Sequence, residues 1–105
     1  MSRGPALAVT LWLGVGLARA AVAGDVALGE HLSGECVTCH QPSGKAVGAI
    51  PPIVGWTEDQ FVAVMQSYRN KERDNPVMQT IAGSLNDAEL AALAAYFGRL
   101  KPVTN

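Results

Sequence analysis

The stretch CVTCH, Cys36–His40, holds both cysteines of the 105-residue chain, three positions apart and followed at once by a histidine. Such a pair can be a redox dithiol, a disulfide, half of a zinc site, or an anchor for a prosthetic group. The residues on either side of this stretch discriminate between these chemistries.

The N-terminal segment predicts export from the cytoplasm. Arg3 precedes an uncharged run, GPALAVTLWLGVGLA (4–18), and the small-residue triplets ARA (18–20) and AVA (21–23) follow it. This order is typical of a secretory signal peptide, and the run is shorter than the ~20 apolar residues that a membrane span needs. We therefore predict a signal peptide over residues 1–23, cleaved after Ala23 or Ala20, and a periplasmic domain over residues 24–105.

The composition of this predicted domain limits the classes of partner that it is expected to bind. Residues 24–105 carry six Lys/Arg and nine Asp/Glu, a net charge of −3. The negative net charge does not suggest a basic surface that would bind nucleic acid. After cleavage of the signal peptide, no further apolar run in the sequence suggests contact with a membrane. A domain this small often needs a covalent staple or a metal.

Helical periodicity recurs in four segments. The first begins at the N-cap candidate Asp25 and is expected to run to about His40. The second begins at a capping box over 57–60, a short one covers about 77–83, and the last begins at a capping box over 86–89. The buried stripes of the two long helices are expected to be Phe61, Val64, Met65 and Tyr68, and Leu90, Leu93, Ala94, Phe97 and Leu100. The chain is thus predicted to be all-α, with three main helices and a short one.

A long loop is predicted over residues 41–55, QPSGKAVGAIPPIVG, because it is rich in glycine and proline. Loops of this length are uncommon in compact domains unless they serve a function. The apolar residues in and just after this loop need a surface to pack on, and a large flat cofactor would supply one; they are Ile50, Ile53, Val54 and Trp56.

The alternatives for the cysteine pair can be weighed against these elements. A thioredoxin-type dithiol belongs to a βαβ context, but no segment shows strand alternation. Zinc needs about four ligands, and the adjacent Cys39 and His40 would hardly join Cys36 in one tetrahedron. A disulfide within this pair would close a loop too short to stabilise much. The pattern C-x-x-C-H is the attachment signal for c-type haem, so we predict one covalently bound haem c, anchored by Cys36 and Cys39.

The same pattern makes His40 an axial ligand of the haem iron through its Nε2. A ligating histidine almost always donates its other ring N–H to an acceptor. A backbone carbonyl of the following loop would serve, and we favour Pro51 over Pro52.

The second axial ligand is predicted to be Met78. It follows Asn75–Pro76 in a loop, off the helical stripes, and lies 38 residues beyond His40, enough chain to reach the opposite face of the ring. Met65, on a helical stripe, and His31, on the first helix, are the alternatives. A methionine–histidine pair raises the reduction potential of the iron.

With these residues the chain resembles the class I c-type cytochromes, and it is similar in particular to the haem subunit of flavocytochrome c sulfide dehydrogenase. The resemblance rests on CVTCH, on IPPIVGWTEDQFVAVMQSYR (50–69) and on NPVMQTIAGSLNDAELAALAAYF (75–97). It implies a class I cytochrome c fold packed around one haem, and Met78 as an iron ligand. It also implies that Gly29 faces Tyr96 or Phe97 where the first and last helices cross.

In function, the resemblance implies electron transfer without bond chemistry by this chain itself. A flavoprotein subunit would oxidise sulfide and pass electrons through the haem to a downstream redox acceptor. Two other hypotheses stay open: a free-standing soluble monohaem carrier for another oxidase or dehydrogenase, and a haem sensor with an open sixth position. The mixed charges of Arg69–Asp74 are expected to form a solvated turn, with steering of a partner as the alternative.

Overall fold

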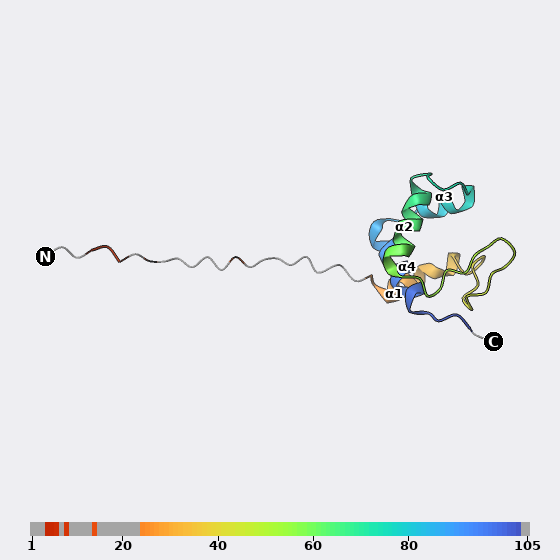
Figure 1. The fold of residues 1–105 in the computed structure, drawn as a ribbon, viewed down its shortest axis with the longest axis horizontal. Helices are drawn as coiled ribbons and strands as arrows, with labels where there is room; N and C mark the ends of the chain where they lie inside the picture. The colour runs from red at the N-terminus through yellow and green to blue at the C-terminus, as the bar shows by residue number, and fades with distance from the viewer. Residues whose placement is uncertain (1–3, 7, 9–13, 15–23, 104–105) are drawn as a thin grey trace.

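The computed structural model describes residues 4–6, 8, 14 and 24–103 and shows a helical domain (Figure 1). Its helices are α1 (Val26–Leu32), α2 (Glu58–Arg69), α3 (Pro76–Gly83) and α4 (Asp87–Arg99), with a 3-10 helix, η1 (Ser33–Glu35), after α1. The described residues contain no strand, only an isolated bridge between Val47 and Ile50. The all-α prediction is confirmed, whereas the predicted signal peptide, residues 1–23, falls almost wholly outside the described residues.

The first helix is shorter than predicted. Asp25 caps it as expected, because its carboxylate accepts the Leu28 N–H at 3.1 Å, but the α-helix ends at Leu32 instead of near His40. The Ser33 hydroxyl donates to the Glu30 carbonyl at 2.6 Å, a local bond that competes with the helical ladder. Gly34 further lowers the helix propensity. The chain therefore tightens into η1 and then turns through the CVTCH stretch.

The other three helices begin at side-chain caps. The Thr57 hydroxyl accepts the Gln60 N–H at 3.2 Å, and the Asn75 side chain accepts the Met78 N–H at 3.0 Å. Both bonds of the capping box are present at α4, where Asn86 and Glu89 exchange them at 2.8 and 3.0 Å. Each such cap contributes about 1 kcal/mol to stability, so the sequence itself defines where these helices begin.

The crossing of α1 and α4 depends on a glycine. A Cβ atom built on Gly29 would overlap the Ala92 carbonyl oxygen and stand 2.7 Å from the Tyr96 Cβ. Only glycine permits this approach, which explains why a residue that weakens helices lies in α1. Of the two aromatic residues that the resemblance implied, Tyr96 is the one that faces Gly29.

The core lies between α4 and the helices that cover it. The Phe61 and Phe97 rings stack with centroids 6.0 Å apart, joining α2 to α4. The predicted core residues Leu90, Leu93 and Ala94 are buried, and so is Ala92, because α1 covers a further face of α4. The loop over 41–55 returns to the same helix, where the Gly55 N–H donates to the Phe97 carbonyl at 2.9 Å.

No helix among the described residues is long and apolar enough to cross a membrane.

Candidate functional site

The CVTCH stretch forms a closed turn directly after η1. The His40 N–H donates to the Cys36 carbonyl at 2.8 Å, and the Cys39 N–H approaches the same carbonyl at 3.2 Å. This turn leaves Cys36 half-buried and Cys39 exposed, and both thiols are free. His40 is buried, with 9% of its surface exposed. The turn thus presents two thiols and directs the imidazole into the domain.

A backbone carbonyl of the 41–55 loop fixes the His40 ring. Nδ1 of His40 lies 2.7 Å from the carbonyl oxygen of Pro51. A carbonyl can only accept, so Nδ1 must carry the proton and Nε2 must hold the free lone pair. Because Nε2 lone pairs bind metals, this hydrogen bond leaves His40 in the tautomer that a metal ligand requires.

The environment of Cys36 disfavours thiolate chemistry. Burial, with a smaller contribution from the charge of Glu35, raises the pKa of the Cys36 thiol to about 11. A reactive dithiol acts through its thiolate, which a raised pKa disfavours. Among the residues that the structure describes, no three His, Cys, Asp or Glu side chains are grouped so that they could hold a metal ion.

Met78 lies in α3, in agreement with the short helix predicted over about 77–83, and not in a loop after Asn75–Pro76. It is the third residue of α3, one turn after the cap Asn75. Pro76 starts the helix because a proline needs no N–H partner at the first helical position. Met78 is half-buried against the core, whereas Met65 is buried within the core on α2 and His31 is exposed on α1.

A cavity of about 290 Å³ adjoins Cys36, between η1, the end of α3 and the start of α4. Its apolar lining is Leu32, Cys36, Ile81, Leu85 and Leu93, and His31, Glu35, Ser84 and Glu89 complete it. Cys39, His40 and Met78 do not line this cavity, so it does not by itself define the proposed haem site.

Half-buried apolar side chains from every α-helix and from the loop pack against the core beside this site. They are Leu32, Cys36, Val37, Ile53, Trp56, Val62, Tyr68, Met78, Ile81, Leu85, Tyr96 and Leu100. The two thiols and the oriented imidazole together fit a covalently attached haem.

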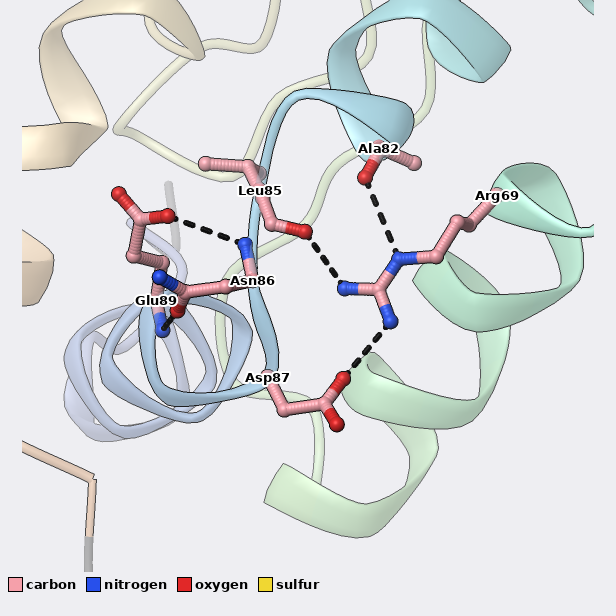
Figure 2. Close-up of polar contacts among 6 residues, drawn as sticks. All are labelled: Arg69, Ala82, Leu85, Asn86, Asp87 and Glu89. Carbon is pink, nitrogen blue, oxygen red and sulfur yellow. Dashed lines mark hydrogen bonds and ion pairs between the residues drawn. The ribbon is translucent and has the colours of Figure 1, made fainter.

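One residue near the site was misjudged from the sequence. Arg69 was grouped with the solvated turn that follows α2, and the residues over 70–77 are indeed exposed. The Arg69 guanidinium, however, points away from that turn to the α3–α4 connection, where it meets Leu85 and Asp87 (Figure 2). A charged residue at a helix end gives no sequence signal that separates these two orientations.

Comparison with known proteins agrees with this site. The family described as Cytochrome c matches residues 26–101. The thiosulfate dehydrogenase electron acceptor of Stutzerimonas stutzeri (strain A1501) is 37% identical over 70 residues, 63% of this chain and 32% of that protein. Cytochrome c4 of Pseudomonas aeruginosa is 32% identical over 97 residues, 90% of this chain and 48% of that protein. Cytochrome c4 of Azotobacter vinelandii is 31% identical over 105 residues, 90% of this chain and 50% of that protein.

The chain spans half or less of the length of these relatives. The family match, in contrast, includes all four α-helices, the CVTCH turn and Met78. The chain therefore belongs to the cytochrome c family, whose members bind covalently attached haem c and transfer electrons.

Proposed function

We propose that this chain is a periplasmic electron carrier in which Cys36 and Cys39 hold one haem and His40 and Met78 ligate its iron. The observation that carries the ligand assignment is the 2.7 Å contact between His40 Nδ1 and the Pro51 carbonyl. It supports Pro51 as the acceptor that holds the proximal imidazole. The secretory pattern over residues 1–23 supports export to the periplasm.

The cysteines and the histidine of the CVTCH turn have different proposed roles in holding the haem. Each cysteine sulfur would bond to one vinyl carbon of the porphyrin, and the thiol hydrogen would go to the neighbouring carbon. His40 would supply an imidazole to the iron, and Met78 would supply a thioether. When bound, the haem provides the one-electron couple, and the methionine ligand raises its reduction potential.

The methionine assignment can be tested by the same substitution at two positions. In the ferric protein, Met78→Leu should abolish the weak red absorption band of a thioether–iron bond. Met65→Leu should keep that band, because a leucine replaces a buried methionine at nearly constant volume. Loss of the band in Met65→Leu alone would assign the ligand to Met65 and refute the proposal. Ready uptake of carbon monoxide by the unmodified ferrous protein at neutral pH would instead favour an open sixth position.

For the electron donor we propose a sulfur-oxidising dehydrogenase, specifically the flavoprotein subunit of a sulfide dehydrogenase. The support is the resemblance over residues 50–69 and 75–97. The haem would pass each electron to a downstream redox acceptor, so that this chain serves sulfide oxidation without catalysing it.

A second donor is favoured by a specific observation. Two relatives are named thiosulfate dehydrogenase electron acceptors, one from Stutzerimonas stutzeri and one from Thiomonas intermedia. A thiosulfate dehydrogenase is therefore the second candidate, and a free-standing carrier that serves another enzyme is the third.

Purification from the native host, followed by haem-reduction assays, separates these donors. Co-elution with a flavoprotein, and rapid haem reduction after sulfide is added to that complex, would support the sulfide dehydrogenase. Reduction only by a thiosulfate dehydrogenase with thiosulfate would favour the second candidate. A monomer that binds no flavoprotein and accepts electrons from neither system would leave the free-standing carrier.

A further inference from the structure

Arg69, the last residue of α2, connects three helices through its guanidinium (Figure 2). Its Nη2 donates to the Leu85 carbonyl at 2.6 Å, and its Nη1 lies 2.7 Å from the Asp87 carboxylate. Its Nε approaches the Ala82 carbonyl at 3.5 Å. One side chain of α2 thereby reaches the end of α3, the α3–α4 connection and the start of α4.

Of these acceptors, the Ala82 carbonyl belongs to the last turn of α3 and also accepts the Leu85 N–H at 3.3 Å, so Arg69 adds a charged donor to it. The last carbonyls of a helix have no partner within the helix, and the helix dipole makes that end attractive to a cation. A charged donor forms stronger hydrogen bonds than a neutral one. The Arg69 side chain is 27% exposed, so water screens these bonds less than it screens those of a free surface arginine. Arg69 thus holds the C-terminal end of α3 to α2.

The helix that Arg69 holds is the one that carries Met78. With eight residues, α3 is too short to be stable by itself, so its position depends on its contacts with α2 and the core. At its N-terminal end, Gln79 donates from its side chain to the Arg73 carbonyl at 2.9 Å. At its other end, Ala82 is fully buried, and its carbonyl oxygen lies 3.5 Å from the Arg69 Nε. Polar contacts thus reach both ends of α3, from the α2–α3 turn through Arg73 and from α2 through Arg69.

We propose that Arg69 is a positioning residue, which clamps α3 to α2 and so keeps the Met78 sulfur on the haem iron. This inference rests on the proposed function, in which Met78 is an iron ligand. It assigns to Arg69 a role in the strength of that ligand bond, beyond a contribution to folding. Without Arg69, α3 would separate more often from α2, and the fraction of molecules with detached Met78 would rise.

Imidazole binding to the ferric holoprotein measures that fraction. Imidazole can reach the iron only when Met78 is detached, so its apparent Kd is the intrinsic Kd divided by the detached fraction. We expect Arg69→Gln to lower the apparent Kd by about tenfold or more, equivalent to about 1.4 kcal/mol. Arg69→Lys should give an intermediate shift, since one ammonium group cannot match the fork of a guanidinium. If Arg69→Gln does not yield folded holoprotein, the imidazole Kd of Arg69→Lys tests the inference in its place.

Two control variants separate positioning from charge and from general stability. Arg99→Gln removes the same charge from α4, where the guanidinium lies 5.4 Å from the Tyr96 ring centre and makes no contact with α3. Thr57→Ala removes the cap of α2 at the end remote from Arg69, and it should reduce stability by about 1 kcal/mol. Both controls should keep the imidazole Kd of the unmodified protein.

The outcomes distinguish this inference from the proposed function. If Met78→Leu binds imidazole much more tightly than the unmodified protein and Arg69→Gln matches Arg99→Gln, the inference about Arg69 is wrong while Met78 remains the ligand. If Thr57→Ala shifts the Kd as much as Arg69→Gln does, the effect is one of general stability and the positioning role is also refuted. If Met78→Leu leaves the Kd unchanged, Met78 is not the ligand, and both proposals fail.

Discussion

The α1–α4 crossing and the α2–α3 contact hold the two halves of the site in physically different ways. At the crossing, the backbones of α1 and α4 approach so closely that Gly29 has no room for a Cβ beside Ala92. At the α2–α3 contact, the Arg69 side chain reaches from α2 to the Ala82 carbonyl of α3 and to the Leu85 carbonyl and the Asp87 carboxylate that follow α3. The first contact depends on shape, and the second depends on directed hydrogen bonds.

This difference between the two contacts corresponds to the different roles proposed for the residues that each contact supports. The crossing supports the segment that leads to Cys36 and Cys39, the proposed covalent anchors, which would form permanent bonds. The polar contact supports Met78, the proposed iron ligand, whose bond to iron would be able to break and form again. Close packing resists small displacements, whereas a few hydrogen bonds can open as a unit. The comparison predicts that substitutions at the crossing lower the free energy of unfolding. Substitutions at the polar contact are predicted to weaken the proposed bond between Met78 and the iron.

The largest effect is expected from Gly29→Ala. The new methyl group would overlap the Ala92 carbonyl oxygen and force α1 away from α4. Overpacking costs typically 1–3 kcal/mol and occasionally more, and because the obstacle is backbone we expect about 3 kcal/mol. Urea unfolding of the holoprotein measures this loss, and the red thioether–iron band of the folded fraction should persist.

Gly34→Ala is the matched control for this prediction. A Cβ on Gly34, in η1, would meet nothing within 4 Å. Replacing a glycine at such a site typically stabilises by about 0.4–1 kcal/mol. Equal losses at positions 29 and 34 would show that the crossing imposes no special packing requirement.

A smaller effect, of about 1 kcal/mol in each case, is expected from removing the caps of α3 and α4. Asn75 caps α3 by accepting the Met78 N–H at 3.0 Å, and Asn86 caps α4 by accepting the Glu89 N–H at 2.8 Å. Asn75→Ala and Asn86→Ala should therefore lower the free energy of unfolding by similar amounts. Only Asn75→Ala should also tighten imidazole binding, because it loosens the turn that holds Met78. Equal imidazole affinities in the two variants would contradict the separation of stability from ligation.

Much of this fold could be predicted from the sequence because its helices begin with local chemistry. The caps at Thr57 and Asn86 involve residues three apart, and a short pattern reveals them. The end of α1 could not be placed, because it depends on the Ser33 hydroxyl and on the turn that CVTCH makes. The burial of Ala92 also escaped prediction, because it reflects the close approach of Gly29 from a distant segment.

The residues of the candidate site also differ in whether a local sequence pattern can predict them. Cys36, Cys39 and His40 follow from one motif, and a loop carbonyl for the imidazole follows from the chemistry of a ligating histidine. No local pattern separates Pro51 from Pro52 as the acceptor, and the Pro51 carbonyl is the one that lies 2.7 Å from His40 Nδ1. Arg69 could not be assigned, because its partners lie 16 and 18 residues further along the chain and no local pattern joins them.

The smallest effect is expected from Asp87→Asn, which separates the two kinds of partner of Arg69. The Asp87 side chain is 81% exposed, and exposed ion pairs contribute typically 0.2–1 kcal/mol, less in salt. We expect a loss of about 0.5 kcal/mol or less in the free energy of unfolding, reduced further at high ionic strength. The imidazole Kd should change by less than about twofold, a difference of ~0.4 kcal/mol, because Arg69 keeps its bond to the Leu85 carbonyl. A shift as large as that of Arg69→Gln would mean that the ion pair, and not the backbone carbonyls, holds α3 in place. The polar contact would then weaken in salt while the α1–α4 crossing would not, so measuring the Kd of the unmodified protein at two ionic strengths tests the same point without any substitution.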